Sequence, residues 1–248
     1  MLNNNYVVID IETTIDKKAI EQSVAKYTKF KTADEFLEFK NASMEDGNTY
    51  FPKPVFHQIH TIGMLYISQS FSMKYIDFCF EDELITLQQF WKIIGKCNLP
   101  TLVGFNSKSF DIPVISMRTG KNMIELKDVY PEIKRFHDCS DQWEKYGPNY
   151  FNRNSKYHID LINDHGWPKP SLSEICTLYD IPVKNYGHGS EIEKMSDKEV
   201  KKYCKEDVLA TAKLWAYHML KFDQEFNFED FQILNNNIKE LEDNNDQG

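Results

Sequence analysis

The stretch Tyr6-Val7-Val8-Ile9-Asp10-Ile11-Glu12-Thr13 decides the fold, because a strand pattern and two acidic residues occur in it together. Its β-branched and aromatic residues predict a buried central β-strand. Side chains alternate between the two faces of a strand, so Asp10 and Glu12 point to the same face. Neighbouring buried carboxylates repel each other and are costly to desolvate, and a divalent cation would relieve both costs. A strand end with solvated acids explains a bare Asp-x-Glu pair more often, so the pair indicates a site only if other acids join it.

Another acid, Asp111, follows a predicted strand in the middle of the chain. The apolar segment Leu102 to Asn106 reads as a short strand that ends in a Gly-Phe-Asn turn, and Ser107 to Pro113 leads into a helix. Asp111 and Pro113 both suit the first turn of a helix. Taken alone, Asp111 could therefore be a helix-capping residue instead of a site residue.

A third motif lies on a predicted late helix that begins near Val200. Tyr203 and Asp207 are four residues apart on this helix, so both side chains share one face and can reach one site. This spacing is common in ordinary helices and is weak evidence by itself.

Together, the three segments resemble the DEDD superfamily of 3′–5′ exonucleases, and the Tyr of the last motif resembles its tyrosine branch. The longer motifs I-D-I-E-T, G-F-N-S-x-x-F-D-I-P and Y-C-x-x-D-V are similar to predicted exonucleases related to the proofreading domain of family-B DNA polymerases. The resemblance extends roughly from Tyr6 to Tyr217. It implies a ribonuclease-H-like α/β fold, with a mixed central sheet flanked by helices.

The resemblance also implies a role for each motif residue. The implied catalytic, metal-binding carboxylates are Asp10, Glu12, Asp111 and Asp207. Tyr203 takes the position of the catalytic residue that orients the attacking water. We expect Thr13, Asn106 and Phe110, which lie within the same motifs, to contact substrate.

Phosphodiester hydrolysis explains why such residues are needed. The reaction requires an activated water and stabilisation of charge on the leaving 3′ oxygen, and two cations about 3.5–4 Å apart can supply both. Oxygen ligands favour Mg²⁺ or Mn²⁺ over zinc. We expect Asp10 to bridge two such ions. A Tyr hydroxyl, with an ordinary pKa near 10, suits hydrogen bonding to water better than it suits general base catalysis.

The order of predicted elements matches this fold. Two antiparallel strands (60–68 and 71–78) and a helix (81–96) precede the strand at 101–104, beside which the first strand should pair. We expect one exonuclease domain over residues 1–224, with an insertion at about 16–56 that holds two short helices with a break near Lys31-Thr32. Aromatic residues of this insertion could stack on bases, although packing against the sheet is the favoured role.

Less regular structure is expected in two regions. Residues 121–157 read as irregular, and residues 225–248, which are rich in acids and Asn with one Lys, read as a partly disordered tail. A strand at 157–161 would carry Asp160, for which a surface or capping role is favoured over a place beside the metals.

Composition limits the class of protein and its partners. The chain has 248 residues and a formal net charge of −9, which predicts short contacts with the 3′ end of a single strand rather than a long duplex footprint. No apolar run approaches the roughly 20 residues of a membrane span. The five cysteines form no C-x-x-C pair, and the N-terminus lacks a signal-peptide pattern, so we expect reduced thiols and a cytoplasmic location.

The favoured function is a metal-dependent 3′–5′ exonuclease that releases nucleoside 5′-monophosphates from single-stranded nucleic acid, with DNA preferred. An exonuclease of RNA or short oligonucleotides would use the same motifs. A catalytically silent nucleic-acid-binding module is an alternative from another class, but it should have lost an acid. A proofreading subunit would need a polymerase or repair partner in trans.

Overall fold

A mixed five-stranded sheet forms the centre of the protein. The computed structural model describes residues 5–24, 30–44, 50–97, 100–137, 150, 157–166, 168–182 and 189–243. The sheet has the strand order β3-β2-β1-β4-β5. Its strands are β1 (Tyr6–Ile15), β2 (His57–Ile67), β3 (Met73–Cys79), β4 (Thr101–Gly104) and β5 (His158–Asp160).

The strand directions give the ribonuclease-H-like arrangement. β2 runs antiparallel to both of its neighbours, β1 and β3. β1, β4 and β5 run parallel to one another. The predicted fold class and the central position of β1 beside β4 are therefore confirmed.

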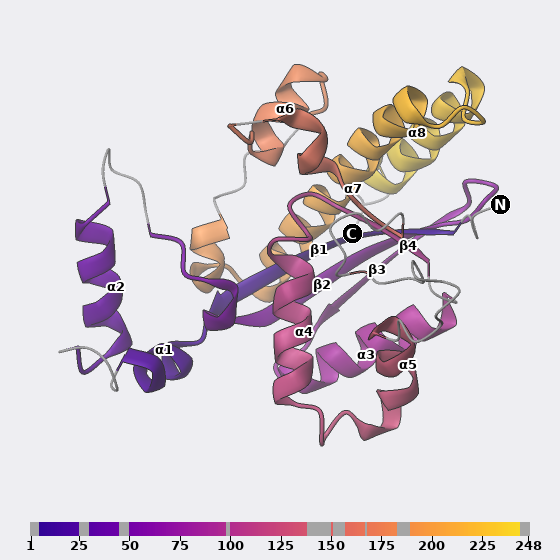
Figure 1. Cartoon of the computed structure of the whole chain (residues 1–248). Coiled ribbons are helices and arrows are strands. Elements are labelled where there is room, and N and C mark those ends of the chain that lie inside the picture. Colours follow the sequence, from indigo (N-terminus) through magenta and orange to yellow (C-terminus); the bar gives the residue numbers. More distant parts are fainter. Residues whose placement is uncertain are drawn as a thin grey trace.

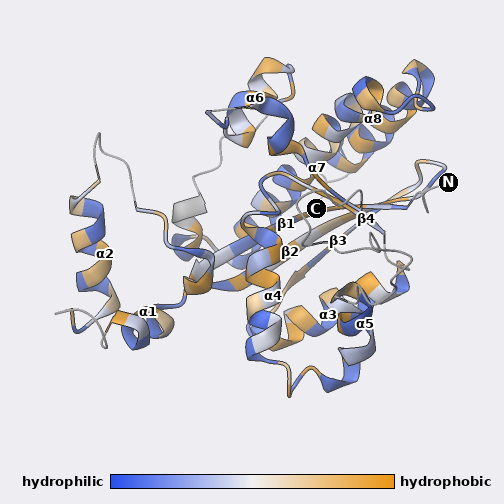
Figure 2. Ribbon diagram, in the orientation of Figure 1, coloured by the Kyte–Doolittle hydropathy of each residue, from blue (hydrophilic) through white to orange (hydrophobic). Residues whose placement is uncertain are grey.

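Helices cover both faces of the sheet, as Figure 1 shows. One layer contains α3 (Glu83–Lys96), α4 (Asp111–Lys121) and α5 (Tyr130–His137), and the other contains α6 (Leu172–Leu178), α7 (Asp197–Phe222) and α8 (Phe228–Asp243). Val7, Ile9 and Ile11 of β1 pack in the first layer, whereas Val8 packs in the second. Figure 2 shows both hydrophilic and hydrophobic residues on these helices, as expected for amphipathic elements that bury one side. The alternation along β1 places Asp10 and Glu12 on the α7 side.

The insertion after β1 forms a small unit of its own. It contains α1 (Lys17–Val24), α2 (Ala33–Ala42) and the short 3₁₀ helix η1 (Pro54–Phe56), and Figure 1 shows α1 and α2 beyond the end of β1. Ile20 and Val24 of α1 are buried against Phe36 of α2. Thr32 caps α2 through a hydrogen bond from the amide of Glu35, which explains the break between the helices. The two predicted helices are both present.

The C-terminal region differs from the predicted tail. Residues 228–243 form α8, and its Leu234 and Ile238 are fully buried in the core cluster that also holds residues of α7. The acidic composition suggested disorder, but the apolar residues recur at helical spacing, and one of the acids, Glu242, pairs at 2.7 Å with Lys213 of α7. The expected boundary at residue 224 thus falls inside one packed unit.

The region 121–157 also contains more structure than predicted. It holds η2 (Lys127–Val129) and α5, whose Ile133 and Phe136 are buried. The further 3₁₀ helices are η3 (Leu161–His165) and η4 (Gly189–Lys194). Within the described ranges, no helix is long and apolar enough to cross a membrane. The four described cysteines are free thiols.

Candidate active site

The middle of β1, around Asp10, packs against α7. Asp10 pairs with Gly63 of β2, and a Cβ atom at Gly63 would lie 2.7 Å from the Cys204 Sγ of α7. The absence of a side chain at Gly63 therefore lets the helix approach the strand beside Asp10. The Cys204 thiol lies 3.7 Å from the Asp10 carbonyl oxygen, which it reaches as a weak donor. Sequence reasoning missed Gly63, and a glycine inside an apolar strand is the signal that could have found it.

Helix α7 brings Tyr203 and Asp207 to the same place. A capping box fixes its start, with Ser196 and Glu199 satisfying each other's backbone amides. Cys204 and Val208, which directly follow Tyr203 and Asp207, are buried toward the sheet. Tyr203 and Asp207 are half-buried and interact by a side-chain hydrogen bond, so they share one face as predicted.

Asp111 enters from the turn after β4. Asn106 has a positive φ of 61°, and its carbonyl accepts hydrogen bonds from the amides of Ser109 and Phe110. This turn starts α4 at Asp111, with Phe110 rather than Asp111 at the capping position. Asp111 is 4% exposed. The structure therefore does not give Asp111 the alternative, helix-capping role.

The four carboxylates interact with one another in a buried environment. Burial raises the pKa of Asp10 well above its ordinary value, and the charges of Glu12, Asp111 and Asp207 raise it further. Burial, and then the charges of Asp207 and Asp111, raise the pKa of Glu12 in the same way. The pKa values of Asp111, about 7, and Asp207, about 6, are also raised mainly by burial. The structure thus brings all four predicted acids together.

This cluster fits divalent cations. Within the described part of the chain, no Lys or Arg side chain forms an ion pair with any of the four acids. The Oδ2 atom of Asp10 is buried and has no hydrogen-bond partner. Ligand atoms of Asp10, Glu12 and Cys204 lie within 4.8 Å of one another, and Asp111 and Asp207 lie outside this close group. Carboxylate oxygens at this spacing suit hard cations, which would supply the missing positive charge.

Tyr203 is protonated in this environment. Burial, and then the charges of Asp207 and Glu12, raise the pKa of its hydroxyl above the ordinary value. A hydroxyl held in the neutral form can donate a hydrogen bond but does not act as a base near pH 7. This electrostatic setting agrees with an orienting role.

The predicted substrate residues border an aromatic surface. Thr13 shares a hydrogen bond of 2.8 Å between its Oγ1 and the Nδ1 of His57. The ring of Phe110 packs edge-on against His57 at 5.0 Å and lies 5.2 Å from the ring of Phe51. Phe51 is 62% exposed. Thr13, Phe51 and His57 also line a pocket of about 190 Å³ that reaches into the insertion.

Phe51 and His57 were missed as individual site residues. The insertion was expected to contribute aromatic residues to packing, and Phe30, Phe36 and Tyr50 do pack within it. Phe51 instead lies exposed on Phe110, beside the turn that carries Asp111. Its place depends on the return of the chain from α2 to β2, which no local pattern indicates.

Asp160 is buried beside the turn before α4 and makes no side-chain cap on η3, so the surface or capping role that the sequence favoured is not what the structure shows. Its Oδ2 accepts a hydrogen bond of 3.0 Å from the amide of Lys108, so it stabilises the turn before α4. It is 5% exposed, which excludes the surface role. Its charge contributes to the raised pKa of Asp111, after burial.

Comparison with known families agrees with this geometry. Residues 48–247 match the sequence profile of a family described as predicted 3′–5′ exonucleases related to the exonuclease domain of PolB. The chain belongs to this family. The resemblance read from the motifs is confirmed, and the matched region contains Asp111, Tyr203, Asp207 and α8. β1, with Asp10 and Glu12, precedes the matched region.

A solved structure shares the fold of this family member. The family B DNA polymerase from the hyperthermophilic archaeon Pyrobaculum calidifontis superposes with a TM-score of 0.51 at 14% sequence identity. The similarity covers 88% of this chain but 25% of the polymerase chain. No curated protein sequence matches the chain.

Proposed function

We propose that the protein is a metal-dependent 3′–5′ exonuclease that hydrolyses phosphodiester bonds at the 3′ ends of single-stranded DNA and releases nucleoside 5′-monophosphates. The observation that carries this proposal is the cluster of four interacting carboxylates, in which the buried Oδ2 of Asp10 has no partner. Family membership supports the reaction class, because the family is described as predicted 3′–5′ exonucleases.

Each residue of the cluster has a role in this proposal. Asp10, Glu12, Asp111 and Asp207 would hold two Mg²⁺ or Mn²⁺ ions, and Asp10, whose pKa is raised by burial and by the charges of the other three acids, would be their shared ligand. When bound, the ions activate water and stabilise charge on the leaving 3′ oxygen. The neutral Tyr203 hydroxyl, hydrogen-bonded within the cluster to Asp207, orients the attacking water.

The surroundings of the cluster support a single-stranded substrate. Exposed aromatic rings bind unpaired bases by stacking, and the exposed Phe51, packed on the partly buried Phe110, offers such a ring beside Asp111. Asn106 shapes the turn that presents Phe110. With a net charge of −9, the chain supports contacts with few phosphates, as at a strand end. The preference for DNA rests on the kinship of the family with a DNA polymerase domain.

A degradation assay on matched substrates tests this proposal. DNA and RNA strands of identical sequence, labelled at the 5′ end, are incubated with Mg²⁺ or Mn²⁺ and, separately, with EDTA. We expect a ladder of DNA products that shorten from the 3′ end, no products in EDTA, and slower cleavage of RNA. Glu229→Gln, which removes an exposed acid of α8, is the matched control for charge and should cleave at the wild-type rate.

Each other outcome assigns a different function. Faster cleavage of RNA, or cleavage restricted to oligonucleotides of a few residues, would replace the DNA substrate while keeping the reaction. Binding of single strands without cleavage under all metal conditions would contradict catalysis and favour a binding module.

A further inference from the structure

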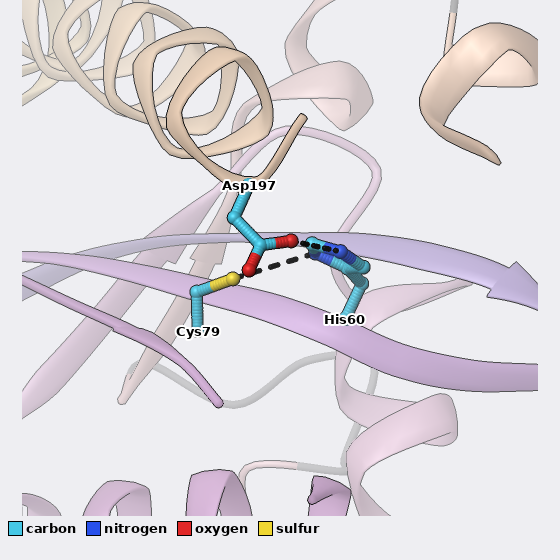
Figure 3. A group of neighbouring side chains, drawn as sticks. All are labelled: His60, Cys79 and Asp197. Atoms are coloured by element: carbon cyan, nitrogen blue, oxygen red, sulfur yellow. Dashed lines mark hydrogen bonds and ion pairs between the residues drawn. The ribbon is translucent and has the colours of Figure 1, made fainter. Parts of the chain in front are cut away.

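A second group of metal-ligand residues lies outside the carboxylate cluster. His60 belongs to β2, Cys79 is the last residue of β3, and Asp197 is the first residue of α7. Figure 3 shows the three side chains pointing toward one another from these elements. One ligand atom from each residue lies within 4.8 Å of those of the other two.

A β-bulge directs His60 toward this position. Glu12 pairs with Thr61, whereas Thr13 pairs with Ile59, so His60 is the extra residue on β2. A bulge breaks the alternation of side chains and can re-aim one of them. The Nδ1 atom of His60 lies 2.8 Å from the hydroxyl of Thr61 and 3.7 Å from the Cys79 Sγ. Thr61 in turn pairs with Cys79 across β2 and β3.

Asp197 approaches from the other side of the imidazole. Its Oδ1 lies 3.3 Å from the Nε2 of His60. The Asp197 side chain is 69% exposed, whereas that of His60 is 24% exposed. The carboxylate can therefore rotate, while β2 and β3 hold the other two ligands.

The three residues are ligand types found in tetrahedral zinc sites, and their ligand atoms lie within 4.8 Å of one another. Zinc bonds of about 2.0–2.3 Å to nitrogen, oxygen and sulfur place adjacent ligand atoms about 3.3–3.6 Å apart. The Nδ1 of His60 lies 3.7 Å from the Cys79 sulfur, whereas its Nε2 lies 3.3 Å from the Asp197 oxygen, so the two close contacts use different imidazole nitrogens. One ion uses one imidazole nitrogen, so binding requires a shift of about 1 Å, within reach of the exposed Asp197 side chain. Sulfur and imidazole ligands select zinc over the Mg²⁺ and Mn²⁺ expected at the carboxylates.

We propose that His60, Cys79 and Asp197 form a Zn²⁺ site, with water as the fourth ligand, that is separate from the exonuclease cluster. On binding, the S–H bond of Cys79 breaks, its proton passes to solvent and a Zn–S bond forms, without any oxidation or reduction. The ion joins β2 and β3 to the first residue of α7.

The site would act on the helix that carries Tyr203 and Asp207. Tyr203 follows Asp197 by six residues, about 9 Å along the helix at 1.5 Å per residue. Zinc at the start of α7 therefore stabilises the position of this helix relative to β2, whose Thr61 pairs with Glu12. This consequence for activity rests on the proposed exonuclease function, whereas metal binding itself does not.

Cobalt binding to the full-length protein tests the site. Co²⁺ replaces zinc in tetrahedral sites, and a bound thiolate gives a sulfur-to-cobalt charge-transfer band in the near ultraviolet. The titration is made in excess Mg²⁺, so that the carboxylates are occupied. We expect the wild type to show this band and the visible absorption of tetrahedral cobalt, and added Zn²⁺ to abolish both. Cys79→Ser should remove the band, and Asp197→Asn should weaken cobalt binding on the order of 10-fold or more.

Three controls assign the band to this site. Cys97→Ser removes another half-buried free thiol and should leave the band unchanged. Asp10→Asn and Cys204→Ser should also retain it, because both residues belong to the other ligand group. The proposal is overturned if the wild type shows no band, if the band survives in Cys79→Ser, if it disappears in Cys204→Ser, or if folded Asp197→Asn binds cobalt as tightly as the wild type. None of these results depends on nuclease activity.

Discussion

Two groups of acids, one around Asp10 in β1 and one around Asp16 just after β1, have opposite electrostatic settings. Asp16, just after β1, is buried and forms a 2.6 Å ion pair with Arg118 of α4, which also pairs at 2.6 Å with Glu83 of α3. Asp10 and Glu12, four to six residues earlier, have only other acids as charged neighbours.

The pKa shifts show the consequence of this difference. Burial alone raises the pKa of Asp16, but hydrogen bonds from Arg118 and the Ala19 amide and the charge of Lys121 outweigh it, so the net shift is downward. Burial raises the pKa of Asp10, and the neighbouring acids add to the rise. The chain thus provides its own cation for the structural acids and none for the cluster, where a metal ion would take that role.

Of the effects that distinguish the two groups of acids, we expect the largest on exonuclease turnover. Asp10→Asn keeps the shape of the side chain but removes the bridging charge, so the exonuclease rate should fall by more than about 10³-fold, beyond the loss for one transition-state hydrogen bond. The free energy of unfolding should stay equal or rise slightly, because repulsion between carboxylates decreases. Single-turnover cleavage of labelled DNA and urea unfolding measure the two effects, and cleavage at the wild-type rate contradicts the assignment.

Loss of Arg118 should have the converse effect. Arg118→Met preserves much of the volume but leaves Glu83 without its cation and Asp16 with only the exposed Lys121, which should lower the free energy of unfolding by about 3–5 kcal/mol. The turnover of the remaining folded protein should stay within a few-fold of the wild type. Lys121→Met is the matched control: it removes an exposed partner of Asp16, 3.3 Å away, and should change stability by less than about 1 kcal/mol. Equal effects of the two variants in urea unfolding would contradict the contrast.

Tyr203→Phe tests whether a neutral group in the acid cluster acts only by orientation. Loss of one orienting hydrogen bond should lower kcat about 10²-fold and leave KM nearly unchanged. Because its pKa is raised by burial and by Asp207, the hydroxyl does not ionise in the working range. The pH profile of the variant should therefore keep the wild-type shape at reduced height. If wild-type activity rises toward alkaline pH and this rise disappears in Tyr203→Phe, Tyr203 acts as a base.

A smaller effect concerns the pH dependence of the ion pair. A carboxyl group whose pKa is lowered in the folded state contributes stability above its unfolded pKa and loses that contribution as the pH falls through its folded pKa. The stability difference between wild type and Arg118→Met should therefore be full at pH 7 and shrink below about pH 4, the ordinary pKa of Asp. Urea unfolding at several pH values measures it, and a constant difference down to pH 3 would exclude Asp16 as its source.

Regular patterns made much of the site predictable. The period of two along β1 placed Asp10 and Glu12 on one face, and the period of the helix placed Tyr203 and Asp207 together. The predicted order of strands then determined that these segments meet beside the turn before Asp111. Such features depend on local spacing, which the sequence states directly.

Other features depend on contacts between distant segments. The bulge at His60 follows from the register between β1 and β2, and the exposed place of Phe51 follows from the path of the insertion. Composition was misleading for α8, where acids and Asn surround the apolar stripe that contains Leu234 and Ile238. Packing of that stripe against α7 is what includes α8 in the folded domain, and the composition does not reveal this packing.

The central claim is that the acids at Asp10 are completed by two divalent cations. Electron paramagnetic resonance can measure Mn²⁺ binding directly, with a single-stranded DNA bound whose last linkages are non-cleavable. We predict two bound ions per wild-type chain, the same number in Cys79→Ser, and fewer in Asp10→Asn. A wild-type chain that binds no Mn²⁺, or an Asp10→Asn chain that still binds two ions with unchanged affinity, would contradict the account.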